Sequence, residues 1–115
     1  MIKKANEIAT MTELGAEGGV GVLELIKPSD YFDKPESLSF FALATLKPGA
    51  SVGYHVHTGE TEMYYILSGE GEYDDNGVIV PVKAGDVTFC KNGEGHGLVN
   101  TGKEDLVFNA MIIYE

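Results

Sequence analysis

The chain has 115 residues, which is enough for one domain with a single hydrophobic core and too few for two. Its formal net charge is −10 and its eight basic residues are all lysines, so nucleic acid and anionic membranes are poor partners for it. The single cysteine, Cys90, excludes both an internal disulfide framework and a cysteine-rich zinc module.

Taken in chain order, the sequence predicts short β-strands separated by turns. Residues 1–19 are mixed in character and are expected to form a loose arm or an edge segment. Asn76-Gly77, a strong signal for a tight turn, predicts a hairpin over residues 71–82. The other predicted strands, each bounded by glycine, proline or polar residues, span residues 20–26, 38–46, 51–57, 62–69, 87–90, 96–100 and 105–114.

This pattern contains no convincing long helix. Strands of about 5–10 residues with frequent turn signals are typical of an all-β sandwich or barrel, here with residues 1–115 as one domain. The N-terminal residues lack the apolar run of a signal peptide, and no segment approaches the roughly 20 apolar residues of a membrane span. A soluble, cytoplasmic protein is therefore expected.

Two of the three histidines lie two residues apart. Successive side chains of a strand point to opposite faces, so His55 and His57 are expected to share a face, about 7 Å apart along the backbone. If the chain turns back after His57, Glu62 opens the neighbouring strand and can bring a carboxylate to the same ion. His96, after another glycine loop, can complete the set from across a barrel. An H-x-H pair alone is a weak signal, because a histidine on a strand is usually an ordinary polar residue.

Three imidazoles and one carboxylate favour a transition metal over calcium or magnesium. One divalent ion per chain is expected, and Mn, Fe, Ni and Zn are not distinguished by these ligands. Four protein ligands on a six-coordinate ion leave two positions for substrate, water or dioxygen. No residues for an organic cofactor are identified.

The spacing of the glycines around these residues matches two motifs of a known protein family. The first stretch reads Gly49, ASVGY, His55, Val56, His57, TGET, Glu62, MYYILS and Gly69. The second reads Gly85, DVTFC, KNG, EG, His96, GLV and Asn100. The chain thus resembles a small single-domain cupin; only Lys91 departs from the pattern, because the family has proline there. That departure affects the rigidity of a loop and leaves the metal ligands unchanged.

The resemblance implies a double-stranded β-helix, or jelly-roll, barrel over residues 38–115. It implies a metal ion held inside by the three histidines and Glu62. It also implies a homodimer, because small cupins often pair through their N-terminal strands. Residues 1–32, as the N-terminal arm and edge strand, are the expected interface.

Strand alternation also bears on residues other than the four predicted ligands. Tyr64 shares the face of Glu62, so it is a candidate donor or acid in the pocket, although packing in the barrel core is the simpler role. Cys90 is expected to be a buried structural cysteine. On the last strand, Phe108, Ala110 and Ile112 share one face and Val107, Asn109, Met111 and Ile113 the other; the sequence does not indicate which face is inward.

The sequence supports three hypotheses about function, and whether the protein is an enzyme is left open. The first is a metal-dependent enzyme, such as an oxygenase, isomerase or decarboxylase, acting on a small polar metabolite. The second is a non-catalytic protein that binds or senses a sugar or a small acid. The third is a purely structural metal. The absence of arginine disfavours phosphosugar and oxalate-type chemistry, because arginine is the side chain best shaped to hold such anions.

Overall fold

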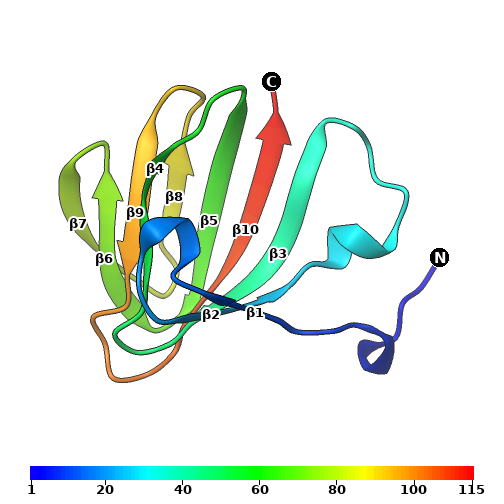
Figure 1. The fold of residues 1–115 in the computed structure, drawn as a ribbon, viewed down its shortest axis with the longest axis horizontal. Helices are drawn as coiled ribbons and strands as arrows, with labels where there is room; N and C mark the ends of the chain where they lie inside the picture. Colours follow the sequence, from blue (N-terminus) through cyan, green and yellow to red (C-terminus); the bar gives the residue numbers. More distant parts are fainter.

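The computed structural model describes residues 1–115 as two antiparallel β-sheets with three short 3-10 helices (Figure 1). The strands are β1 (Met11–Leu14), β2 (Val22–Ile26), β3 (Leu38–Leu46), β4 (Ser51–Val56), β5 (Glu60–Ser68), β6 (Glu70–Asp75), β7 (Val78–Lys83), β8 (Val87–Cys90), β9 (Gly95–Val99) and β10 (Leu106–Tyr114). The helices are η1 (Ala5–Glu7), η2 (Ala16–Gly18) and η3 (Pro28–Tyr31). No helix is long and apolar enough to cross a membrane. The predicted all-β class is confirmed.

The larger sheet has the strand order β1-β2-β3-β10-β5-β8, and the smaller sheet has the order β4-β9-β6-β7. Alternation along each strand places one set of side chains between the sheets and the other outside. On β10 the inward set is Leu106, Phe108, Ala110 and Ile112, all of them buried. The face of the last strand that looks inward is therefore the one that carries Phe108.

Most strands lie where the sequence placed them, and the Asn76-Gly77 turn joins β6 and β7 as predicted. Both turn residues have positive φ, 52° and 92°, as a two-residue hairpin requires. Residues 11–14 form β1 at the edge of the larger sheet, which agrees with the edge segment that was one of two expectations for residues 1–19. β1 forms because β2, itself paired with β3, gives it a partner, a non-local contact that no local pattern reports. The sequence placed no element at η3, which lies against β3, where the backbone N–H of Phe41 donates to Oγ of Ser29.

One expected neighbour relationship is wrong. Glu62 was expected on the strand beside His55 and His57, and His96 from across the barrel. Instead, β4 and β9 are adjacent, with His55 opposite His96 in the register, whereas Glu62 lies on β5 in the other sheet. The short turn after His57 crosses from one sheet to the other instead of forming a hairpin.

Gly69 and Gly85, from the two motif stretches, allow a test of why glycine is needed at each turn. Gly69 has φ +88°, and a Cβ there would overlap the carbonyl oxygen of Asp105, whereas Gly85 has φ +94° and open space around it. We expect Gly69→Ala to lower the free energy of unfolding by roughly 3 kcal/mol, because strain and a backbone clash add. Gly85→Ala should cost only about 1 kcal/mol, from strain alone. Urea unfolding of both variants measures this, and equal losses would contradict the assigned clash.

Candidate metal centre

Four side chains converge inside the barrel from three strands and one turn. His55 lies on β4, His57 directly follows β4, His96 lies on β9 and Glu62 lies on β5. Their ligand atoms all lie within 4.8 Å of one another. His57, Glu62 and His96 are buried and His55 is half-buried. The structure therefore brings together all four residues that the sequence predicted as metal ligands.

The Nε2 atoms of the histidines point at one another and at the carboxylate. The Nε2 atom of His57 lies 3.1 Å from that of His55 and 3.0 Å from that of His96. The Oε1 atom of Glu62 lies 3.1 Å from Nε2 of His57 and 2.9 Å from Nε2 of His96. A single small ion can contact all four atoms at this spacing.

The opposite ring nitrogen, Nδ1, of each histidine has a separate partner, 2.7 Å away in each case. His55 faces the carbonyl oxygen of Gly53 and His57 faces Oε1 of Glu60. His96 faces the hydroxyl of Tyr73. A carbonyl and a carboxylate can only accept, so the rings of His55 and His57 donate through Nδ1–H. Their Nε2 atoms are then free to act as ligands, which is the arrangement that orients metal-binding histidines.

This donor set fits a cation. Lone pairs on the Nε2 atoms and the charge of Glu62 repel one another at about 3 Å in a buried site unless a proton or a metal ion lies between them. Three imidazole nitrogens with one carboxylate oxygen suit a divalent transition metal. The cluster can therefore hold one metal ion, with His55, His57, Glu62 and His96 as its ligands.

Without a metal ion, bound protons offset the repulsion between the four ligand atoms. The hydrogen bond to Glu62 raises the pKa of His57 to about 9; burial opposes this rise and Glu60 adds to it. Burial alone would raise the pKa of Glu62, but hydrogen bonds from His57 and His96 outweigh burial and lower it. The metal-free cluster thus holds a proton on His57 at neutral pH, and a metal ion must displace it.

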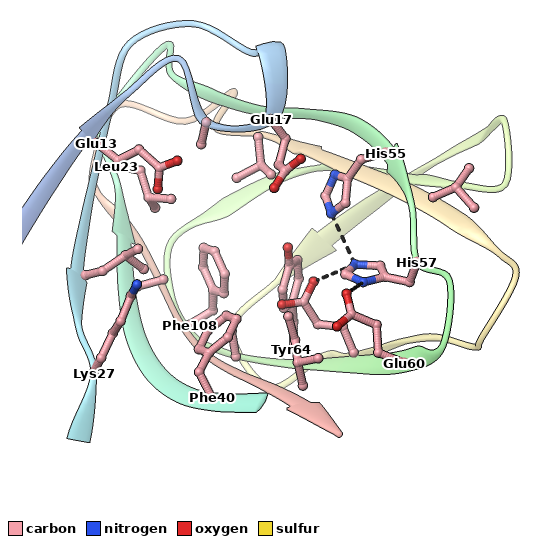
Figure 2. A pocket seen from close by; sticks show the side chains of 18 residues that line it. Glu13, Glu17, Leu23, Lys27, Phe40, His55, His57, Glu60, Tyr64 and Phe108 are labelled. Atoms are coloured by element: carbon pink, nitrogen blue, oxygen red, sulfur yellow. Dashed lines mark hydrogen bonds and ion pairs between the residues drawn. The ribbon is translucent and has the colours of Figure 1, made fainter. Parts of the chain in front are cut away.

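The cluster opens on one side into a cavity of about 360 Å³ (Figure 2). His55, His57, Glu60, Glu62 and Tyr64 line it at the metal end. Apolar residues of β3 and β10, including Phe40 and Phe108, line its middle. Glu13, Glu17 and Lys27 line the side formed by the N-terminal segment.

Sequence reasoning missed several of these residues. Glu60 lies in the stretch TGET and was given no role, although its position three residues after His57 was a usable signal. No local signal marked Glu13, Glu17 and Lys27, because they reach the cavity only through the packing of β1, η2 and β2 around it.

Tyr64 packs in the barrel core and also lines the cavity. Its ring stacks on His96, with centroids 5.1 Å apart, and packs against Phe108 at 4.6 Å. It also lines the cavity beside Glu62. Burial raises its pKa well above 10, so its hydroxyl keeps its proton and can act as a hydrogen-bond donor. Its assignment as a catalytic residue stays a prediction.

Cys90 is buried at the end of β8, as expected. Burial raises the pKa of its thiol to about 11, so the thiol stays protonated at neutral pH and is a poor nucleophile. Asn100, from the second motif, is also buried, and its Nδ2 atom donates to the carbonyl oxygens of Leu46 and Glu104. Cys90 and Asn100 therefore have structural roles, and neither lines the cavity.

The family model for the cupin domain matches residues 42–114, which include all four clustered residues. The chain belongs to the cupin family. The two sheets, the topology and the inward-facing cluster agree with the double-stranded β-helix of this family. The expected fold is thereby confirmed.

A protein and a crystal structure from Thermotoga maritima are similar to this cupin over almost its whole length. A protein named oxalate-binding protein is 44% identical over 113 residues, which are 98% of this chain and 93% of that protein. A crystal structure described as a predicted oxalate decarboxylase is 42% identical, has a TM-score of 0.88 and matches 100% of both chains. A sugar phosphate isomerase from Silicibacter pomeroyi, 19% identical over 97% of this chain and 74% of its own, has a TM-score of 0.79 and shares the fold alone.

The raised pKa of His57 predicts opposite pH trends with and without metal. Its protonated form stabilises the metal-free protein fully below pH 6.5, and this stabilisation is lost as the pH rises through about 9. Metal affinity should rise over the same range, because the ion needs the neutral ring. Thermal melts of chelated and metal-loaded protein, with competition titrations, measure both trends. Parallel trends in the two forms would contradict the assignment, and a His57→Asn variant should lose the effect.

Glu60 offers a separate test of how His57 is held. Glu60→Gln removes the charge next to Nδ1 of His57, and we expect metal affinity to fall by about 10-fold or more, as for other partners of metal-bound histidines. Glu13→Gln, which changes another cavity glutamate, is the matched control and should leave the affinity within about twofold. Isothermal titration with a competing chelator measures the metal affinity of both variants. Equal losses of affinity would show that the overall negative charge of the cavity matters, and not the contact between Glu60 and His57.

Proposed function

We propose that this cupin binds a small dicarboxylate, with oxalate as the model ligand, at a divalent transition metal held by His55, His57, Glu62 and His96. The observation that carries the proposal is that three of these residues line the cavity itself. A bound ion would therefore be accessible to a ligand, which a purely structural metal would not need.

The charges around the cavity explain why the metal is required. The cavity lining carries four carboxylates, from Glu13, Glu17, Glu60 and Glu62. Against them stand the ammonium group of Lys27 and, in the metal-free protein, the protonated ring of His57. This surface repels a dianion. The metal, when bound, supplies the positive charge that attracts carboxylate oxygens and polarises them.

The name of the Thermotoga protein and the description of the Thermotoga crystal structure support oxalate over other small acids. The absence of arginine had disfavoured this chemistry. That objection loses force here, because a dicarboxylate that chelates an ion needs no guanidinium group. Lys27 is the one side chain of the lining that can add a second positive charge.

The remaining residues of the cavity have distinct tasks in this proposal. Phe40 and Phe108 provide apolar walls that exclude water and strengthen electrostatic attraction at the ligand. Tyr64 holds its proton and can donate a hydrogen bond to a carboxylate oxygen. Such a weak acid is poorly suited to transfer that proton, which favours binding over a reaction that uses Tyr64 as the acid.

The test uses protein purified without a metal-affinity tag and analysed for its metal content. Titration calorimetry should show oxalate binding to the metal-loaded form and none to the chelated form. Acetate, with one carboxylate, should bind at least tenfold more weakly. A variant with His55→Ala and His57→Ala should lose both metal and oxalate, whereas Lys27→Ala should weaken oxalate only severalfold. Oxalate binding to chelated protein that depends on Lys27 would contradict the proposal.

Decarboxylation of the same ligand is the second candidate, favoured by the description of the 42% identical structure. Metal-loaded protein incubated with oxalate would then release formate and carbon dioxide in equal amounts. We expect binding without formate above the background of the double histidine variant. Metal-dependent formate production would assign the protein as an enzyme.

A further inference from the structure

His96 differs from the other two histidines of the cluster in the partner of its Nδ1 atom. His55 and His57 face a carbonyl oxygen and a carboxylate, which can only accept, so both rings carry a proton on Nδ1. His96 faces the hydroxyl of Tyr73, 2.7 Å away, and a hydroxyl can either donate or accept. The position of the ring proton of His96 therefore depends on where the hydroxyl proton of Tyr73 points.

In the metal-free protein, the contacts of His96 favour a proton on Nε2. This atom lies 2.9 Å from Oε1 of Glu62, and hydrogen bonds from His57 and His96 lower the pKa of that carboxyl against the effect of burial. The carboxylate is therefore ionised at neutral pH and only accepts, so Nε2–H of His96 donates to it. A lone pair remains on Nδ1, and the hydroxyl of Tyr73 donates to it.

A metal ligand needs the opposite arrangement. Nε2 of His96 must offer its lone pair, so the neutral ring has to carry its proton on Nδ1. Nε2 releases one proton and Nδ1 takes one up, and the charge of the ring does not change. Nδ1–H then donates to the hydroxyl oxygen of Tyr73. Because Tyr73 is buried, its own hydroxyl proton needs another acceptor, since an unpaired buried donor is costly.

Thr88 is placed to be that acceptor. It points inward from β8 of the larger sheet, and Tyr73 points inward from β6 of the smaller sheet. Oγ1 of Thr88 is the one buried side-chain nitrogen or oxygen atom of the protein without a hydrogen-bond partner. Burial raises the pKa of Tyr73, and the nearby hydroxyl of Thr88 opposes this rise. An unpaired oxygen thus lies next to the hydroxyl that needs an acceptor.

We propose that Tyr73 and Thr88 are positioning residues that hold the ring proton of His96 on Nδ1 and so make Nε2 a metal ligand. The hydroxyl of Tyr73 then accepts from His96 and donates to Oγ1 of Thr88, a hydrogen bond that this structure does not contain. The two hydroxyls act through His96 and do not touch the ion. The inference rests on the metal site of the proposed function and is independent of the identity of the ligand.

The first test compares zinc affinities, measured by competition with a chelator. Thr88→Val keeps the shape of the side chain and removes the acceptor, so we expect the affinity to fall about tenfold. Thr88→Ser restores the hydroxyl and should remain within about twofold of the wild type. Tyr73→Phe removes the link between His96 and Thr88 and should lower the affinity tenfold or more.

Urea unfolding of the chelated protein separates this role from a purely structural one. The hydroxyl of Thr88 has no hydrogen bond to lose there, so Thr88→Val should leave the urea midpoint unchanged or raise it. A residue that only supports the fold would lose stability and zinc affinity together, and that result would overturn the proposal. Equal zinc affinity for the wild type and Thr88→Val, or for Thr88→Val and Thr88→Ser, would overturn it as well.

The second test reads the proton position by nitrogen NMR on protein with isotope-labelled histidine. We expect the ring proton of His96 on Nε2 in the chelated protein and on Nδ1 in the zinc-loaded protein, whereas His55 carries it on Nδ1 in both. A proton already on Nδ1 of His96 in the chelated protein would contradict the proposal. Wild-type protein that binds no metal would overturn this inference and the proposed function together, whereas zinc binding without oxalate binding would overturn the proposed function alone.

Discussion

The structure depends on four acceptor atoms held within 4.8 Å of one another in the interior of a small barrel. Their mutual repulsion must be offset by a proton or a cation, and this requirement determines much of what surrounds them. The partners of the Nδ1 atoms, from Gly53, Glu60 and Tyr73, turn the other nitrogen of each histidine inward. The raised pKa of His57 expresses the same constraint in the metal-free protein.

The charge of a bound metal ion would also determine whether the cavity attracts an anionic ligand. The lining of this cavity is acidic, since its four carboxylates outnumber Lys27 and the protonated His57 of the metal-free protein, so under the proposed function an anionic ligand is repelled until the cluster is filled. The proposed function therefore couples ligand binding to metal binding through electrostatics, and it requires no conformational change. The apolar walls around Phe40 and Phe108 strengthen this coupling, because they lower the local dielectric constant.

The two faces of the larger sheet differ in composition. Its inner face supplies Glu62, Tyr64 and the walls of the cavity, and its outer face is uncharged over four strands.

The sequence by itself determined the all-β class, the hairpin at Asn76-Gly77 and the four clustered residues, because these depend on local turn chemistry and on a fixed spacing. Tertiary structure decided which sheet carries each of the four. His96 lies beside His55 and Glu62 comes from the opposite sheet, since strand pairing in this fold joins segments far apart in the chain. The inward face of β10 and the roles of Glu13, Glu17 and Lys27 were decided in the same way. Alternation along a strand defines two faces, and only packing against the other sheet determines which of them is buried.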